Sequence, residues 1–143
     1  MITKRLGKRR PFIADTSVWS PFLRKSQELN GEARKRLRDG ISNGAVHLLG
    51  IIKQECLSGI RENQQYERLK EILGGFPEEL ATSEDHLRAA ELFNICRRNG
   101  IQGSTADFLI CSQSIRLGYP VLTMDKDFTR YAQYLPILLM NVK

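Results

Sequence analysis

The sequence predicts an α/β fold: a central, mostly parallel sheet of four to five short strands with helices on both faces. Two observations support this class. Short apolar segments alternate with longer amphipathic segments along the chain, which is typical of parallel strands connected by helices. The length of 143 residues suits one compact domain. We expect a basic arm over residues 1–10 and a single domain over residues 11–143.

The chain as far as residue 75 is expected to hold two strands and four helices. An apolar strand over 11–14 precedes a helix over 16–24. A second helix, over 31–42, repeats apolar residues every four positions, at Ala33, Leu37 and Ile41. Asn43-Gly44 predicts a turn into a strand over 45–49. Helices over 51–60 and 63–73 follow, and Gly74-Gly75 ends the second of them.

The rest of the chain continues the alternation. A weakly patterned strand over 79–83 precedes a helix over 84–98, for which Ser83 is the expected N-cap. Ser104 opens a helix that reaches Leu117 and stops at Gly118. Strands over 120–123 and 136–141 complete the expected sheet.

Residue counts exclude several classes of protein. No apolar run approaches the roughly 20 residues of a membrane helix. The apolar stretch 12–14 behind the basic start is too short for a signal peptide, so we expect a cytoplasmic protein. Nucleotide-binding and serine-nucleophile motifs are missing.

The cysteines and histidines do not suggest a zinc site. At their spacing they cannot supply four tetrahedral ligands. The cysteines lie among apolar neighbours and are expected to be buried, reduced thiols. The residues concerned are Cys56, Cys96, Cys111, His47 and His86.

Most of the net charge of +6 belongs to the start of the chain. Five basic residues and no acid occur within residues 1–10, namely Lys4, Arg5, Lys8, Arg9 and Arg10, which leaves +1 for the remainder. A second basic cluster comprises Arg34, Lys35, Arg36 and Arg38. Such an arm attracts RNA and other polyanions without sequence preference, and a solubilising tail explains the same charges equally well.

Four acids stand out by their position. Asp15 and Asp125 directly follow apolar strands, and functional side chains of parallel sheets gather beyond the carboxyl ends of the strands. Glu55 lies at the edge of the apolar arc of its helix, and Asp107 lies in the first turn of the helix opened by Ser104. Neither Glu55 nor Asp107 has a basic residue three or four positions away, although exposed helical acids often do.

Each acid also has a structural explanation. Asp15 and Asp125 are expected N-caps of the helices that follow them, and Ser104-x-x-Asp107 fits a capping box. A distant arginine is an alternative partner for Glu55, and Arg130 follows Asp127 by three residues. Taken together, however, carboxylates gathered at one sheet edge would repel each other, and a hard divalent cation is the usual remedy. Oxygen ligands without His or Cys favour Mg²⁺ or Mn²⁺ over zinc.

Four segments occur in series: Phe-Ile-Ala-Asp15-Thr-Ser-Val-Trp19, Glu55-Cys-Leu-Ser-Gly59, Thr105-Ala-Asp107-Phe-Leu-Ile-Cys111 and Leu122-Thr-Met-Asp125-Lys-Asp127-Phe128. In order and spacing, over about residues 11–143, the sequence resembles the PIN-domain ribonucleases, in particular the VapC-type toxins of toxin–antitoxin pairs. No single segment is specific to that family, whereas the four in series are. One difference is the basic arm, because these toxins commonly begin almost directly with the first strand.

The resemblance implies a PIN-like three-layer fold and metal-assisted hydrolysis of RNA phosphodiester bonds. It implies that Mg²⁺ (or Mn²⁺) is held by Asp15, Glu55, Asp107 and Asp125, with Asp127 as a further acid of the site. It also implies that hydroxyls of Ser17 and Thr123 orient the carboxylates or a water. A 5′-phosphate product, a homodimer and inhibition by a cognate antitoxin covering the acidic cleft are further implications.

Two other function classes are open. A non-catalytic PIN-like module would bind RNA or a protein without cutting, and it would more readily carry Asn or Ala at the four acidic positions. A receiver-like phosphoacceptor domain predicts paired acids after the first strand, where Asp15 stands alone. Trp19, Phe22 and Leu23 have helical core spacing, which favours packing over base stacking for the tryptophan.

Overall fold

The computed structural model describes residues 10–25, 27–29 and 31–142. Of the predicted basic arm only Arg10 is among them, and it is exposed; Lys4, Arg5, Lys8 and Arg9 lie outside. The described strands are β1 (Phe12–Ala14), β2 (Val46–Leu49), β3 (Glu78–Glu79) and β4 (Val121–Leu122). The described helices are α2 (Thr16–Leu23), α3 (Gly31–Ser42), α4 (Gly50–Leu57), α5 (Asn63–Leu73), α6 (Ser83–Arg98), α7 (Thr105–Leu117) and α8 (Asp127–Tyr131).

The four strands form one parallel sheet in the order β3-β2-β1-β4. In the central strand β1, Phe12 pairs with Val46 of β2, and Ile13 pairs with Val121 of β4. All three residues of β1 are buried, as expected for a parallel strand covered on both faces. Because every pairing is parallel, the carboxyl ends of β1, β2 and β4 share one edge of the sheet, and that edge carries the candidate site.

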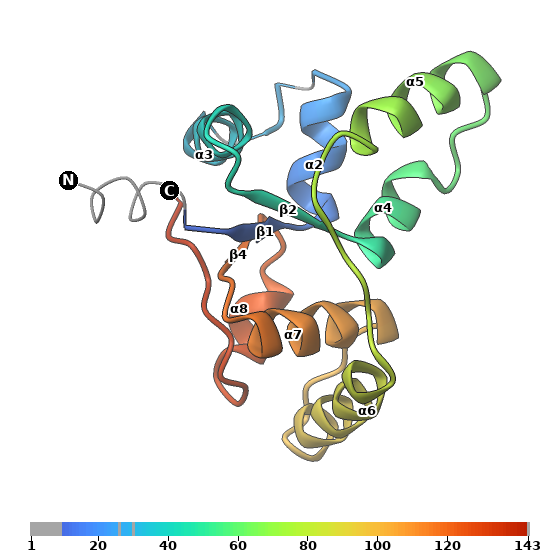
Figure 1. Cartoon of the computed structure of the whole chain (residues 1–143). Coiled ribbons are helices and arrows are strands. Elements are labelled where there is room, and N and C mark those ends of the chain that lie inside the picture. The colour runs from blue at the N-terminus through green and yellow to red at the C-terminus, as the bar shows by residue number, and fades with distance from the viewer. Residues whose placement is uncertain (1–9, 26, 30, 143) are drawn as a thin grey trace.

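Helices cover both faces of the sheet (Figure 1). α2 and α3 lie on one face, whereas α7 lies on the other with α6 packed against its outer side. On the first side Trp19 is fully buried, and its ring centroid is 5.0 Å from that of Phe76. On the second side the aromatic core contains Phe108, Phe128 and Tyr131. The packing role expected for Trp19 is therefore confirmed.

A glycine allows α3 to approach the sheet closely. A Cβ atom at Gly40 would lie 2.8 Å from Cγ2 of Val46 and would overlap the ring of Phe12. The backbone of α3 thus rests directly on β1 and β2. This contact helps to fix β1, the strand from which Asp15 follows.

The predicted α/β class and all six predicted helices are confirmed. The helix expected over 51–60 ends earlier, at Leu57, because Ser58 is extended and Gly59 has a φ of 87°. The three cysteines are buried and free, as expected. Among the described residues, no helix is both long and apolar enough to cross a bilayer.

Four details of the prediction are wrong. The strand expected over 79–83 is replaced by β3, which covers Glu78–Glu79. The cap of α6 is Thr82 rather than the expected Ser83, so the last two residues of the expected strand belong to the helix start. The strand expected over 136–141 is reduced to a single bridge between Val121 and Leu139. The short helix α8 was not expected at all.

Candidate metal centre

Asp15 follows β1 directly and is almost completely buried, with an exposed fraction of 5%. It occupies the N-cap position of α2, but its side chain does not cap the helix, so the structural explanation for this acid is wrong. Instead the Ser17 hydroxyl donates to Oδ1 at 2.6 Å and the Thr123 hydroxyl donates to Oδ2 at 3.0 Å. Burial raises the pKa of Asp15, the bonds from Ser17 and Thr123 lower it, and the charges of Asp125 and Asp107 raise it; together they bring the pKa to about 6.

The same two hydroxyls connect Asp15 to the segment after β4. The Met124 N–H donates to Oγ of Ser17 at 2.8 Å, and the Asp125 N–H donates to Oγ1 of Thr123 at 2.9 Å. Each hydroxyl thus accepts a backbone bond and donates to the buried carboxylate. This network fixes the loop that carries Asp125 relative to Asp15.

Three carboxylates lie together beside this network. Asp107, Asp125 and Asp127 each offer an oxygen within 4.8 Å of the other two. Asp107 comes from the first turn of α7, whereas Asp125 and Asp127 follow β4. Oδ1 of Asp125 accepts the N–H of Asp127 at 2.9 Å, and Oδ2 of Asp107 accepts the Tyr131 hydroxyl at 2.6 Å.

Electrostatics distinguishes Asp107 from an ordinary surface acid. Burial raises the pKa of Asp107, and the charges of Asp125 and Asp127 add to the effect, whereas bonds from Tyr131 and Ser104 lower it. The cation that pairs with the group among the described residues is Arg130, 3.8 Å from Asp127. Both partners of that pair are substantially exposed, so it offsets little charge.

Glu55 lies apart from the three-carboxylate group. It is exposed on α4, and its Oε1 accepts the Thr16 hydroxyl at 2.8 Å. Thr16 is the neighbour of Asp15, so Glu55 is tied to the site through the start of α2. Among the described residues no arginine pairs with Glu55, and its hydrogen-bond partner is the hydroxyl of Thr16.

The donor set fits a hard divalent cation. All the clustered ligand atoms are carboxylate oxygens, with no histidine or cysteine among them, and such a set selects Mg²⁺ or Mn²⁺. Close carboxylates that lack a strong cationic partner are stabilised by a bound ion. The structure brings together Asp107, Asp125 and Asp127, with Asp15 near enough for its pKa to respond to their charges.

Sequence reasoning missed Tyr131, which touches the site through its hydroxyl. The signal was present as Phe128 and Tyr131, two aromatic residues three positions apart, a spacing that places both on one face of a helix. The segment was too short for that pattern to be noticed, because α8 has only five residues.

Comparison with known proteins agrees with the fold. The chain matches the family model for the PIN domain over residues 12–134, and it belongs to the PIN domain family. No curated protein sequence matches it.

Several solved structures share the fold. The structure of VapBC2 from Rickettsia felis bound to a DNA fragment from its promoter has a TM-score of 0.72 at 15% identity, covering 91% of this chain and 97% of that one. VapC20 of Mycobacterium tuberculosis, described as a sarcin-ricin loop cleaving toxin, has a TM-score of 0.66 at 18% identity, covering 89% and 98%. A toxin–antitoxin complex from Klebsiella pneumoniae has a TM-score of 0.63 at 16% identity, covering 82% and 89%.

Proposed function

We propose that the protein is a cytoplasmic, Mg²⁺- or Mn²⁺-dependent ribonuclease, the toxin of a toxin–antitoxin pair, that hydrolyses RNA phosphodiester bonds. The observation that carries the proposal is the group of Asp107, Asp125 and Asp127 beside the buried Asp15 at the carboxyl edge of the sheet. The PIN domain match supports it, as does the likeness to VapC20 of Mycobacterium tuberculosis, the sarcin-ricin loop cleaving toxin.

In this proposal the acids bind the ion, and the hydroxyls of Ser17 and Thr123 orient Asp15. Asp107, Asp125 and Asp127 would hold the ion together with Asp15, and Glu55 would complete the acidic set from α4. A bound ion of this kind supplies an activated water and offsets charge on the scissile phosphate. The hydroxyls of Ser17 and Thr123 hold both oxygens of Asp15 in place, so that this carboxylate is oriented before the ion arrives.

Two hollows beside the carboxylates offer a path for RNA. One, of about 380 Å³, is lined by residues that include Asp125 and Lys126. The other, of about 310 Å³, is lined by residues that include Ser17 and Arg24. Met124 lines both. We propose that the RNA backbone crosses Met124, with a basic side chain in each hollow to contact phosphate.

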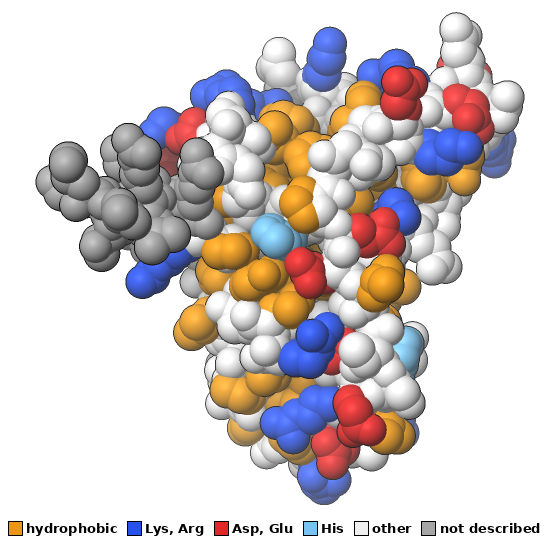
Figure 2. Space-filling model, in the orientation of Figure 1, with side chains coloured by type: hydrophobic (Ala, Val, Ile, Leu, Met, Phe, Trp, Pro, Cys, Tyr) orange, Lys and Arg blue, Asp and Glu red, His pale blue; other side chains and the backbone are white. Residues whose placement is uncertain are grey.

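Figure 2 shows basic and acidic side chains interspersed over the face in view, without a continuous patch of either sign. On α3, Lys35 pairs with Asp39 at 3.8 Å and Arg36 pairs with Glu32 at 3.0 Å. The second basic cluster therefore shares its helix with acids, whereas residues 1–10 contain none, which makes the arm the better candidate for general RNA attraction.

The arm itself is proposed to bind RNA weakly through Lys4, Arg5, Lys8, Arg9 and Arg10. Deleting residues 1–10 removes five positive charges, so the affinity for RNA should fall and its dependence on salt should become shallower. Cleavage at saturating RNA should persist. Fluorescence anisotropy with labelled RNA measures the affinity at several salt concentrations. If the deletion leaves the dependence of the affinity on salt unchanged, the arm does not bind RNA.

We further propose that an antitoxin protein covers the acidic site and that the toxin acts as a homodimer. The support for the antitoxin is the structural likeness to chains of toxin–antitoxin complexes, including the one from Klebsiella pneumoniae. The homodimer is what the family resemblance implies. The simplest test is co-expression with the product of the neighbouring small reading frame, followed by co-purification and measurement of the mass of each species.

The test of the proposed activity is cleavage of total RNA with Mg²⁺, with Mn²⁺ and with EDTA. We expect cleavage with either metal, none with EDTA, and 5′-phosphate ends on the products. Asp125→Asn, purified in parallel, excludes a contaminating nuclease. Asp39→Asn is the matched control, because Asp39 is an exposed acid paired on α3. Undiminished cleavage in EDTA would refute the mechanism, and RNA binding without cleavage in either metal would favour the binding module.

A further inference from the structure

Tyr131 is a buried phenol whose hydroxyl reaches the candidate metal centre. Its exposed fraction is 0%, and the hydroxyl donates to Oδ2 of Asp107 at 2.6 Å. A buried tyrosine hydroxyl needs an acceptor, and here the acceptor is a carboxylate from another helix, 24 positions earlier in the chain. The bond therefore joins α8 to the start of α7.

Packing fixes both ends of this bond. The ring of Tyr131 lies 4.8 Å, between centroids, from the ring of Phe108, and 5.3 Å from that of Phe128. Phe108 is fully buried and directly follows Asp107. Neither the phenol nor the backbone of Asp107 can move far without disturbing this aromatic cluster.

Gly103 provides the space that the hydroxyl occupies. A Cβ atom at this position would overlap the hydroxyl oxygen of Tyr131, and it would lie 2.7 Å from Cζ of the same ring. It would also lie 2.9 Å from Cε2 of Phe108. The loop before α7 is thus shaped around the phenol.

We propose that Tyr131 is a positioning residue that holds Oδ2 of Asp107 and so presents Oδ1 to the divalent ion shared with Asp125 and Asp127. This inference rests on the proposed function of the site. In the absence of an ion, the like charges of Asp125 and Asp127 favour rotation of the Asp107 carboxylate away from them. A hydrogen bond from a packed donor opposes that rotation, so the ligand is oriented before binding.

The chemistry of the donor supports this role. A phenol is neutral at neutral pH, because its usual pKa is about 10. The bond therefore orients Asp107 and leaves its negative charge available for a cation. Asp15 is held in the same manner, by the neutral hydroxyls of Ser17 and Thr123.

The test is the affinity for Mn²⁺, measured from the electron paramagnetic resonance signal of the free ion, in the full chain and in Tyr131→Phe. The variant keeps the ring and loses only the hydroxyl. We expect the Kd for Mn²⁺ to rise about 10–100-fold, as is typical when a partner of a metal ligand is removed. The cleavage rate at limiting Mn²⁺ should fall with it and should recover substantially when Mn²⁺ is raised to saturation.

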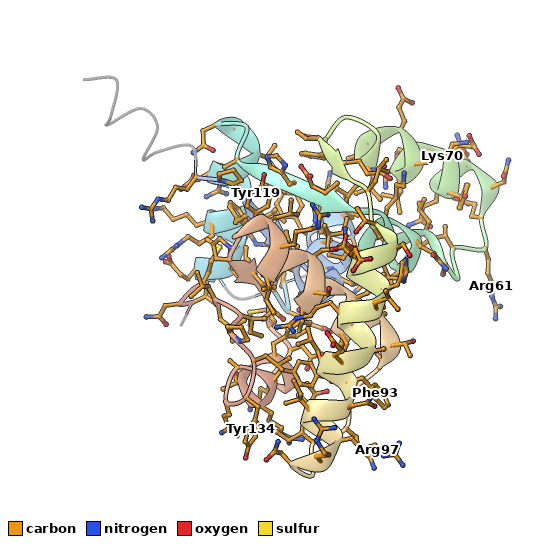
Figure 3. The ribbon with its side chains drawn as sticks, turned by 60° about the horizontal axis from the view of Figure 1, so that its bottom comes forward. Arg61, Lys70, Phe93, Arg97, Tyr119 and Tyr134 are labelled. Atoms are coloured by element: carbon orange, nitrogen blue, oxygen red, sulfur yellow. The ribbon has the colours of Figure 1, made fainter. Side chains whose placement is uncertain are left out.

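Tyr134→Phe is the matched control. Tyr134 follows α8, is 45% exposed, and lies at the lower edge of the molecule in Figure 3. It should keep the Kd of the parent protein. Melting temperatures in EDTA report any purely structural effect of either change, since a packing role would lower the melting temperature of Tyr131→Phe and leave its Kd unchanged.

A double-mutant cycle with Asp107→Asn shows whether Tyr131 acts through Asp107. In the Asp107→Asn background the Tyr131→Phe change should have little further effect on the Kd for Mn²⁺. Equal effects in the two backgrounds would overturn the inference, as would an unchanged Kd in Tyr131→Phe alone. A parent protein that binds no Mn²⁺ and cleaves no RNA would instead overturn the proposed function, and the inference with it.

Discussion

Helices α6 and α7 both begin with a hydroxyl residue followed three positions later by an aspartate. In each helix the side-chain oxygen of the cap, Thr82 or Ser104, accepts the backbone N–H of the aspartate at 3.0 Å. The side chains of the two aspartates then differ. Oδ2 of Asp85 accepts the backbone N–H of Thr82 at 2.8 Å, which completes a capping box. Oδ2 of Asp107 instead accepts the hydroxyl of Tyr131.

The charged neighbours of the two aspartates differ as well. Two nitrogens of Arg116 bind Asp85 at 2.7 and 2.9 Å, and this contact lowers the pKa of Asp85. Asp107 faces Asp125 and Asp127, and burial together with these charges raises its pKa. The comparison shows that one local motif begins both helices, while tertiary neighbours decide whether the carboxylate is neutralised or left for a cation.

The largest expected effect is the loss of RNA cleavage in Asp107→Asn, with Asp85→Asn as the comparison. Asp107→Asn should lower RNA cleavage by about 10³-fold or more, a barrier increase of about 4 kcal/mol, because it removes an ion ligand. In EDTA the variant should be at least as stable as the parent, because one of the repelling charges is gone. Asp85→Asn should instead lower stability and leave the cleavage rate per folded molecule unchanged.

Thermal melts with and without Mg²⁺ complete this test. Mg²⁺ should raise the melting temperature of the parent more than that of Asp107→Asn, by mass action on the folded state. If Asp107 only supported its helix, the variant would keep its activity and lose about 0.3–1 kcal/mol of stability. If Mg²⁺ raised the melting temperatures of the parent and of Asp107→Asn equally, and the variant still cleaved RNA, Asp107 would have only a structural role, like Asp85.

The next effect is a pH dependence of stability that comes from Asp15. Its pKa is raised to about 6 from 3.8, so the folded, metal-free protein binds this proton more tightly than the unfolded chain does. Stability in EDTA should therefore fall as the pH rises from about 4 to about 6, by up to about 3 kcal/mol. Asp15→Asn should lack this component, and denaturant titrations at several pH values would measure the difference. Parallel pH profiles for the parent and the variant would contradict it.

A bound ion should reverse the sign of this dependence. The ion requires the ionised carboxylate, so its affinity should increase as the pH rises through about 6. The stabilisation by Mg²⁺ should therefore be larger at pH 7.5 than at pH 5.5 in the parent. This gain with pH should be smaller in Asp15→Asn.

The third effect is on stability, from removing Arg116, the cation that pairs with Asp85. Arg116→Met leaves the carboxylate of Asp85, which is 2% exposed, without its charged partner. We expect a loss of about 1–3 kcal/mol in the free energy of unfolding, less than for a fully buried pair because Arg116 is 41% exposed. The cleavage rate should not change. Arg88→Met is the control, because Arg88 pairs with Glu91 on the surface; its change should stay within about 0.5 kcal/mol.

The contrast between the two aspartates also shows what the sequence can predict. The fold class and six helices follow from apolar periodicity and from breaking residues such as Gly74 and Gly118, which act locally. The positions of Asp15 and Asp125 follow from the end of a strand. The cap Ser104 is confirmed, because its bond to the Asp107 N–H spans only three residues.

What the sequence does not predict depends on contacts between distant segments. The pairing of Asp85 with Arg116 spans 31 positions, and that of Tyr131 with Asp107 spans 24. The strand expected over 136–141 fails for a similar reason: only Leu139 pairs with β4 in a bridge. Asp127 lies in the carboxylate group because of the conformation of the segment after β4, in which its N–H donates to Oδ1 of Asp125. Residue spacing alone does not reveal that conformation.

The smallest expected effect compares the two caps themselves. Thr82→Ala and Ser104→Ala each remove one acceptor at a helix start, and each should lower stability by about 1 kcal/mol. Thr82→Ala should leave the Kd for Mn²⁺ unchanged, because Asp85 binds Arg116 and not an ion. Ser104→Ala should weaken Mn²⁺ binding a few-fold as well, since the backbone of Asp107 loses the bond that fixes the first turn of α7. Denaturant titrations and Mn²⁺ titrations on both variants make the comparison. Equal Mn²⁺ affinities would show that Tyr131 and the aromatic cluster are sufficient to hold Asp107, and that Ser104 serves only the helix.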